Sequence, residues 1–168
     1  MFAIDFECPD HAAAIDRLVD ETFGPGRFAK TAYRLREGVA PVEALSLVAF
    51  MGEGPERRMV GSLRFWPILI GDTPALLLGP LAVEPALRGK GCGIQLMERG
   101  LAEAARLGHR LVILVGDVAY YGRVGFARVP AGSLIMPGPV NPARLLYREL
   151  AVGALDGVSG AVTPARAI

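Results

Sequence analysis

The residues with the clearest potential for chemistry form the segment RGKGCG, from Arg88 to Gly93. Its three alternating glycines have no Cβ atom, so a ligand can lie directly against the main chain. An apolar stretch precedes the segment and an amphipathic stretch follows it, which predicts a strand, a turn and a helix. The first turn of a helix presents unpaired N–H groups and a partial positive charge. The segment is therefore predicted to bind an anion such as a phosphate.

Two common phosphate-binding motifs do not match this segment. A Walker loop requires GxxxxGK[ST], and the dinucleotide fingerprint requires GxGxxG, whereas the glycines here follow GxGxG. A second conspicuous segment lies one predicted helix and one predicted strand further along the chain. It reads AYYGRVGF, from Ala119 to Phe126, and contains two adjacent tyrosines.

Together the two segments resemble the acetyl-CoA signature of the GNAT acetyltransferase superfamily. RGKGCG is similar to the family's [QR]xxGx[GA] pattern, and AYYGRVGF is similar to its aromatic-Tyr-x-x-x-Gly-Phe element. The resemblance extends over roughly residues 1–150. Within the family, the chain resembles a subgroup of small bacterial predicted acetyltransferases. It implies acetyl-CoA as cosubstrate and a primary amine, on a small molecule or a protein, as acceptor.

The resemblance also implies which residues hold the cosubstrate. The pantetheine arm would pair with the backbone of Leu81, Ala82 and Val83 like an added strand. Arg88 and Lys90 would add charge near the phosphates, although the alternative for both is a solvated turn. The residues whose backbone N–H groups are implied to hold the pyrophosphate are Arg88, Gly89, Lys90, Gly91, Cys92, Gly93 and Ile94.

The catalytic residues follow from the same resemblance. Tyr121 aligns with the family tyrosine, whose phenol can protonate the departing thiolate. The alternative is a tyrosine that packs on the cofactor arm, and Tyr120 is then the fallback acid. Glu84 and Asp117 follow the two central strands and are candidates for the base, but each could equally be a surface or capping carboxylate. Water is a further carrier for that proton.

Cys92 suggests a second kind of chemistry, because a helix N-terminus lowers the pKa of a thiol. The family does not need a covalent step, and a cysteine becomes a credible nucleophile only beside an oriented base. We therefore expect that Cys92 occupies a position that tolerates a small residue and that it has no catalytic role. His, Cys and carboxylate residues do not cluster with metal-ligand spacing in the sequence, so no metal is expected.

The composition limits the partners. The 168 residues are 52% hydrophobic and 21% charged with a net charge of +1, which gives no reason to expect nucleic acid or an anionic membrane. The first residues lack the apolar region of a signal peptide, and no apolar run reaches the length of a membrane span. A soluble cytoplasmic protein is expected, and a homodimer stays open.

The resemblance and the order of the predicted elements imply one α/β domain with the GNAT fold over residues 1–152. A mixed central sheet of about six or seven strands is expected, with about four flanking helices. Its N-terminal strands are antiparallel, and the central strands Ala75–Val83 and Leu111–Val115 run parallel, splayed around the cofactor. Residues 153–168 are weakly patterned and predict a mobile tail or a loose edge.

Two further segments are expected to shape the site. Gly79-Pro80 interrupts the first central strand, either as a kink between two short strands or as a bulge that turns N–H groups toward a ligand. Arg27 to Glu37 predicts a polar helix that borders the acceptor groove together with the loop Pro130–Pro142. Neither carries a run of acids that would select a polyamine, so the acceptor stays unnamed.

A function of another class also fits these residues. The chain could be a binding module that holds acyl-CoA without transferring anything, as a sensor or a partner subunit. The glycine-rich turn would be needed in both cases. The two hypotheses differ at Tyr121, whose phenol is required only for transfer.

Overall fold

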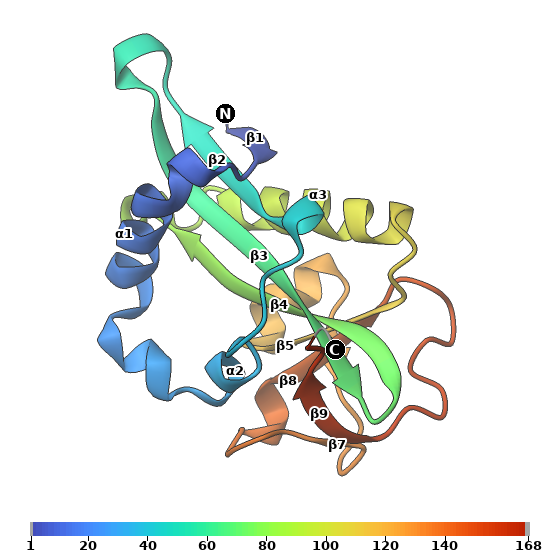
Figure 1. Ribbon diagram of the computed structural model, residues 1–168. Coiled ribbons are helices and arrows are strands. Elements are labelled where there is room, and N and C mark those ends of the chain that lie inside the picture. The colour runs from blue at the N-terminus through green and yellow to red at the C-terminus, as the bar shows by residue number, and fades with distance from the viewer. Residues whose placement is uncertain (1, 167–168) are drawn as a thin grey trace.

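The computed structural model describes residues 2–166, apart from the side chains of residues 28 and 29. Two long neighbouring strands, β3 (Arg58–Ile70) and β4 (Thr73–Val83), lie in the middle of the central sheet (Figure 1). The strands are β1 (Ala3–Phe6), β2 (Leu47–Met51), β3 (Arg58–Ile70), β4 (Thr73–Val83), β5 (Leu111–Val115), β6 (Ala127–Arg128), β7 (Leu134–Ile135), β8 (Leu145–Glu149) and β9 (Gly160–Pro164). The α-helices are α1 (Ala12–Phe23), α2 (Thr31–Arg34), α3 (Cys92–Arg106) and α4 (Val118–Tyr121).

Short 3₁₀ turns join several of these elements. They are η1 (Pro9–His11), η2 (Pro25–Ala29), η3 (Glu43–Leu45), η4 (Gly54–Glu56), η5 (Pro85–Leu87), η6 (Gly122–Val124) and η7 (Pro142–Arg144). None of the helices within residues 2–166 combines the length and the apolar character needed to cross a membrane.

The sheet is mixed, as predicted. Its strand order is β1-β2-β3-β4-β5-β8-β6, and β9 pairs with β3 and with β7. Along the main order, β4 and β5 run parallel and the other neighbours run antiparallel. The nine described strands exceed the expected six or seven because β7 and β9 had no pattern that predicts a strand.

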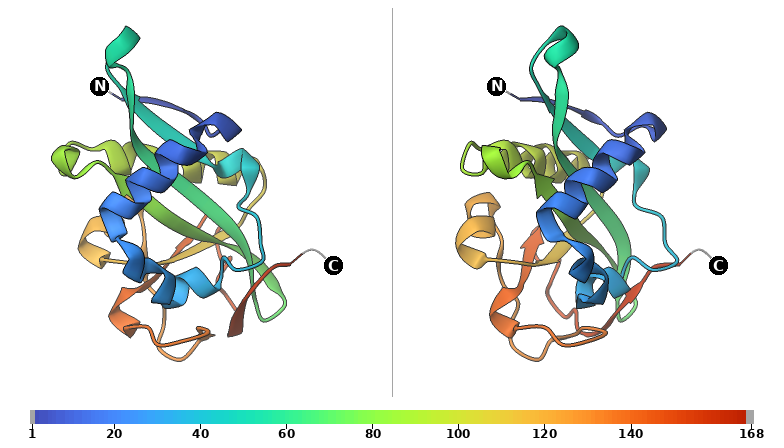
Figure 2. Two further views of the ribbon diagram at one scale, coloured as in Figure 1. Left: turned by 60° about the vertical axis from the view of Figure 1, so that its left-hand side comes forward. Right: turned by 90° about the vertical axis from the view of Figure 1, so that its left-hand side faces the viewer.

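The two faces of the sheet are covered by different helices (Figure 2). Side chains alternate along a strand, and β2 shows the consequence. Leu47 and Ala49 pack into the core that α3 covers, whereas Val48 and Phe50 pack against α1. The apolar strands are therefore buried on both sides, and the start of α3 is held at the end of β4.

β4 separates from β5 at its second half. It pairs with β3 from Thr73 to Val83, but with β5 only at Leu76 and Leu77. The register with β3 shifts between Leu63 and Phe65, so that Gly79 and Pro80 together lie opposite one β3 residue. The interruption in this strand is thus a bulge rather than a break into two strands. The splay leaves the β5 side of the last residues of β4 without a strand partner in the described chain.

The predicted helix from Arg27 to Glu37 is wrong. The segment forms η2 and the four-residue α2, with extended backbone at Lys30 between them. Tertiary contacts hold this shape: Thr31 Oγ1 donates to the carbonyl of Pro139 at 2.7 Å, and Arg34 Nη1 donates to that of Pro137 at 2.7 Å. The shape of the segment is therefore set by its hydrogen bonds to the loop at Pro137 and Pro139, and the chain does not continue as one helix.

The segment predicted as a tail or loose edge contains β9. Val162 of β9 is 1% exposed and belongs to the core beside β3. The pairing runs between Ile68 and Pro164, Leu69 and Thr163, and Ile70 and Val162. This strand lies at the far end of β3 from the glycine-rich turn, so it does not enter the site described next.

Candidate active site

Two cavities meet where β4 has left β5. The larger cavity has a volume of about 640 Å³ and the smaller cavity about 380 Å³. Leu81, Tyr120 and Tyr121 line both of them. From this junction the smaller cavity continues to the glycine-rich turn, and the larger cavity continues to η2, α2 and η7. Two ligands could therefore reach the same tyrosines from opposite sides.

The start of α3 forms one end of the smaller cavity. Gly91 is the N-cap with a φ of 89°, a left-handed conformation that glycine adopts without strain. The first hydrogen bond of the helix runs from the N–H of Gln95 to the carbonyl of Gly91 at 3.0 Å. In the described part of the chain, the backbone N–H groups without a hydrogen-bond partner at this turn are those of Gly89, Gly91, Cys92, Gly93 and Ile94.

Arg88 and Lys90 use their N–H groups inside the turn. The N–H of Arg88 donates to the carbonyl of Pro85 at 3.3 Å, and that of Lys90 donates to the carbonyl of Leu87 at 3.1 Å. What these two residues offer an anion is therefore the charge of the side chain. Arg88 lines the smaller cavity, whereas Lys90 is exposed and lies outside its lining.

Gly93 allows the closest approach in the site. A Cβ added at this position would overlap the Oη atom of Tyr120. The phenol of Tyr120 therefore lies directly over the first turn of α3. This contact closes one wall of the smaller cavity beside Leu81, which contributes to the wall from β4.

The last residues of β4 present alternate faces. Leu81 and Val83 line the smaller cavity, whereas Ala82 is 0% exposed and packs on the α1 side of the sheet. The three predicted pantetheine contacts are therefore two cavity-lining residues and one whose side chain faces the core.

Three residues of the smaller cavity were not among the predicted site residues. Arg123 lines it from η6, Leu87 from η5 and Thr22 from the end of α1. Arg123 lies inside AYYGRVGF, so a basic residue within that segment was an available signal. Thr22 gave none, because only the fold brings α1 to the glycine-rich turn.

Tyr121 is held in a packed aromatic group. Its ring lies 5.0 Å from that of Tyr120 and 6.3 Å from that of Phe126, both edge to face. A Cβ added at Gly116 would overlap the same ring. Burial raises the pKa of Tyr121 to about 12, and burial also raises the pKa of Tyr120. Both phenols therefore keep their protons at neutral pH.

Cys92 faces away from the cavities and into the core. The residue is 1% exposed, and a Cβ added at Gly61 of β3 would lie 3.0 Å from its Sγ atom. Burial raises the pKa of its thiol to about 11, which outweighs the lowering expected at a helix N-terminus. Its contribution to the smaller cavity is therefore its backbone.

The two candidate bases lie in different surroundings. Glu84 accepts hydrogen bonds from Arg58 Nε and Nη2 at 3.2 and 3.3 Å, and it lines neither cavity. Asp117 lines the larger cavity and caps α4, because its Oδ1 accepts from the N–H of Ala119 at 3.2 Å. The structure brings only Asp117 near the tyrosines. Across residues 2–166, no three His, Cys, Asp or Glu side chains form a group that could hold a metal ion.

Sequence relatives of the chain carry acetyltransferase names. The family model "Acetyltransferase (GNAT) family" matches residues 13–126. The "Uncharacterized N-acetyltransferase YhbS" of Escherichia coli (strain K12) is 33% identical over 161 residues, which is 95% of this chain and 93% of that protein. The "Uncharacterized N-acetyltransferase YjhQ" of the same strain is 32% identical over 140 residues, 80% of this chain and 75% of that protein.

Solved structures show the same fold. The crystal structure of the GNAT family N-acetyltransferase YhbS from Escherichia coli in complex with CoA has a TM-score of 0.80 at 32% identity, over 97% of this chain and 89% of that one. A GNAT family acetyltransferase from Brucella melitensis in complex with acetyl-CoA has a TM-score of 0.60 at 29% identity, over 93% and 99%. The predicted fold is confirmed, and the chain belongs to the acetyltransferase (GNAT) family.

Proposed function

We propose that this chain transfers the acetyl group of acetyl-CoA to a primary amine by direct attack, with the cosubstrate in the smaller cavity and the acceptor in the larger one. The observation that carries the proposal is the junction of the two cavities at Leu81, Tyr120 and Tyr121. An acetyl group that reaches this junction from the smaller cavity would meet an amine that enters from the larger cavity. YhbS and the Brucella protein, which are relatives of similar fold, were solved with CoA and acetyl-CoA.

The residues of the smaller cavity fit this cosubstrate. Five backbone N–H groups from Gly89 to Ile94 have no partner among the described residues, which suits the oxygens of a pyrophosphate. The side chains of Arg88 and Arg123 add positive charge beside them. The β5 side of Leu81 to Val83 is free to pair with the amide groups of the pantetheine arm. All of the donors except the two arginines belong to the main chain.

Acetyl-CoA supplies an activated acyl carbon and a thiol as leaving group. In this proposal a strand N–H near Leu81, next to the bulge of β4, donates to the acyl oxygen. One such donor, held in position by the fold, contributes roughly 2.7–4 kcal/mol to catalysis in known enzymes.

Tyr121 is our candidate for the acid that protonates the leaving sulfur. Its pKa of about 12 exceeds that of a thiol in water, so transfer to a solvated thiolate would be uphill. Desolvation of a thiolate in a closed cavity raises the pKa of its thiol as well, which reduces this difference. Tyr120 is the alternative acid.

Asp117 is our candidate for the group that accepts the amine proton. It lies on the wall of the larger cavity, on the acceptor side of Tyr121. Glu84 is the second candidate, although its carboxylate is engaged by Arg58 and lines neither cavity. A water molecule between Asp117 and the amine would extend its reach.

The proposal is tested with the matched variants Tyr121→Phe and Tyr120→Phe. We expect Tyr121→Phe to lower kcat by roughly 10²-fold, the lower end for loss of a general acid, with unchanged affinity for CoA. Tyr120→Phe should keep most of the activity. The reverse order would move the acid to Tyr120. If the unmodified protein binds CoA but acetylates no amine in a broad panel, the proposal fails and a non-catalytic acyl-CoA sensor takes its place.

A further inference from the structure

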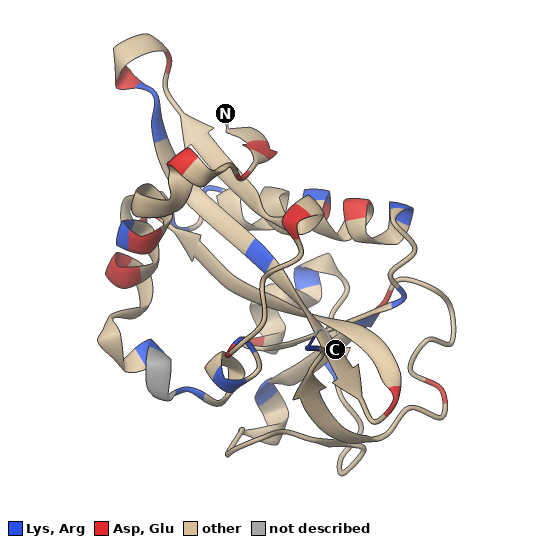
Figure 3. Cartoon of the chain, in the orientation of Figure 1, with Lys and Arg blue, Asp and Glu red and all other residues tan. Residues whose placement is uncertain are grey.

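The larger cavity concentrates positive charge in a chain whose net charge is only +1. Its lining contains five basic side chains and one carboxylate, that of Asp117, counted over the described residues. The basic segments gather around α2 and the turn that precedes β8, drawn blue in Figure 3. The basic residues in this lining are Arg27, Lys30, Arg34, Arg36 and Arg144.

Two of these residues have structural partners that account for their presence. Arg27 pairs with Asp20 and donates to the carbonyl of Gly24 at 2.9 Å. Arg34 is exposed and donates to the carbonyl of Pro137 at 2.7 Å. Both contacts hold the wall of the cavity in place.

Arg36 is different because part of its guanidinium group is buried without a partner. Its Nε atom is shielded from solvent and makes no hydrogen bond within residues 2–166. The guanidinium carbon lies 6.0 Å from the centre of the Trp66 ring, and a Cβ added at Gly79 would lie 3.1 Å from Nη2. Trp66 Nε1 in turn donates to the carbonyl of Gly79 at 2.6 Å. Arg36 therefore lies against the bulge of β4, beside the junction of the two cavities.

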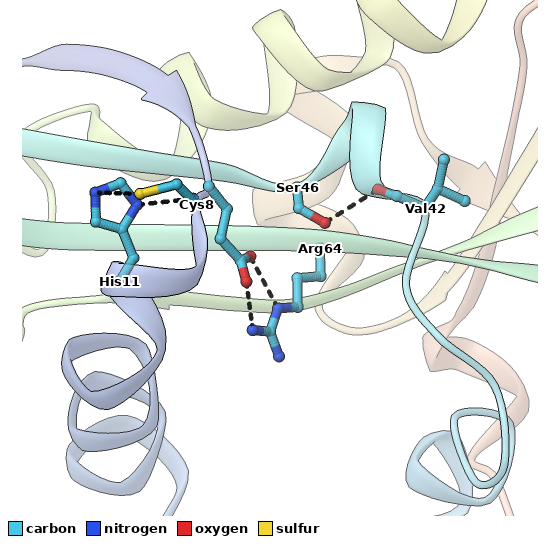
Figure 4. Close-up of polar contacts among 6 residues, drawn as sticks. Cys8, His11, Val42, Ser46 and Arg64 are labelled. Carbon is cyan, nitrogen blue, oxygen red and sulfur yellow. Dashed lines mark hydrogen bonds and ion pairs between the residues drawn. The ribbon is translucent and has the colours of Figure 1, made fainter.

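The charge of Arg36 has no counter-ion among the described residues. Besides its burial, two neighbours act on its pKa: the phenol of Tyr33 raises it, and Arg64, which has the same sign of charge, lowers it. Arg64 is itself neutralised by Glu7, since its Nη2 and Nε donate to the two carboxylate oxygens at 2.6 and 3.0 Å, as the dashed lines to Arg64 in Figure 4 show. Among the described residues, no carboxylate pairs with Arg36.

Arg36 nevertheless stays charged. Burial lowers the pKa of its guanidinium to about 10, which is still well above neutral pH. A buried charge without a counter-ion is costly for a folded protein, and an arginine fork matches the two oxygens of a carboxylate or phosphate. The missing partner is therefore a group that comes with the ligand.

We propose that the acceptor is a small amine that also carries an oxyanion, a carboxylate or a phosphate, and that Arg36 binds this group. The inference rests on the proposed acetyl transfer, because it places the acceptor in the larger cavity. A small molecule is favoured over a protein because Arg36 is part-buried and lies in the lining of the larger cavity, so its partner has to enter the cavity. Lys30 and Arg144 are exposed at the same cavity and add attraction for an anion on its way in.

The test compares paired probes for binding to the protein saturated with CoA. The probes are N-acetylglycine and N-acetyl-4-aminobutyrate with their carboxamides, and O-phospho-N-acetylethanolamine with N-acetylethanolamine. Calorimetry should show the charged member of at least one pair binding at least tenfold more tightly, which corresponds to about 1.4 kcal/mol. The carboxylate and phosphate pairs identify which oxyanion is preferred.

Three variants assign this preference to a residue. Arg36→Gln should remove it while the affinity for CoA is unchanged. Arg36→Lys keeps the charge but loses the planar fork, so we expect the preference to fall at least threefold, roughly 0.7 kcal/mol. Arg128→Gln, a change at an exposed arginine of β6 outside both cavities, should have no effect. If Arg36→Gln does not fold, Arg36→Lys decides.

Several results would overturn the inference. Equal or tighter binding of the neutral probes, an unchanged preference in the Arg36 variants, or no binding of any probe would each do so. A peptide with an acidic N-terminus that binds when the small probes do not would replace the small molecule by a protein. Acetylation of neutral amines in preference to their acidic counterparts would refute this inference and leave the proposed transfer intact. Failure of the unmodified protein to bind CoA would refute the proposed transfer itself.

Discussion

The contact between Gly93 and Tyr120 allows a sharp prediction, because it depends on one oxygen atom. A Cβ added at Gly93 would overlap Tyr120 Oη, yet it would lie 3.6 Å from Cζ of the same ring and 3.3 Å from Leu81 Cδ2. Without the hydroxyl oxygen, an alanine would therefore make nearly ordinary contacts. The variants Gly93→Ala, Tyr120→Phe and the double variant separate these effects.

Two opposing contributions set the expected magnitude. Alanine in place of glycine within a helix stabilises by about 0.5–1 kcal/mol. Forcing a packed ring aside costs about 1–3 kcal/mol. We therefore expect Gly93→Ala to lower the free energy of unfolding by about 1 kcal/mol and to weaken CoA binding, because the ring lines the smaller cavity. In the double variant the cost of displacing the ring disappears, whereas the stabilisation by alanine in the helix remains. The coupling energy between the two substitutions should therefore be about 1–3 kcal/mol.

The assay is a double-mutant cycle measured twice, once by denaturant unfolding and once by calorimetric titration with CoA. Gly122→Ala serves as the control, because no heavy atom lies within 4 Å of a Cβ added there. Additive effects of Gly93→Ala and Tyr120→Phe would show that the phenol does not lie over the start of α3. The closed wall between α3 and the tyrosines would then be refuted.

Three further predictions follow from the site. Asp117→Asn keeps an oxygen that can cap α4, so it should lower activity without lowering stability. Asp117→Ala loses the cap and should also cost about 0.5–2 kcal/mol of stability. Full activity of Asp117→Asn would exclude the role of Asp117 as base. Near about pH 8 the buried thiol of Cys92 should react with iodoacetamide far more slowly than the exposed Cys8, and equal rates would contradict the core position. The raised pKa of Tyr121 means that its stabilising contribution is present below the unfolded-state value near 10 and is lost as pH rises to about 12, so Tyr121→Phe should flatten the fall in stability over that range.

The parts of the site that the sequence revealed are those encoded by neighbouring residues. RGKGCG specifies a turn and a helix start through local backbone preferences, and α3 begins at Cys92 directly inside it. AYYGRVGF likewise contributes neighbouring residues to the cavity walls, namely Tyr120, Tyr121 and Arg123. Such segments can be predicted from the sequence because their conformation is set by adjacent residues and does not depend on distant contacts.

What the sequence did not reveal depends on distant contacts. η2 and α2 take their shape from the loop around Pro137 and Pro139, more than a hundred residues away in the chain. Arg36 looked like a residue on a polar helix, and only the fold places it against Trp66 and the β4 bulge without a counter-ion. β9 has a weak pattern of its own and is stabilised by its pairing with β3.

The central claim is that the open amides at the start of α3 and the free side of β4 hold the cosubstrate. The most direct measurement is a titration of isotopically labelled protein with CoA, followed by NMR of the backbone amides. We expect the largest shift changes at Gly89, at the amides from Gly91 to Ile94, and at Leu81 to Val83. Binding of CoA that leaves these amides unperturbed, or no binding to the folded protein, would contradict the claim.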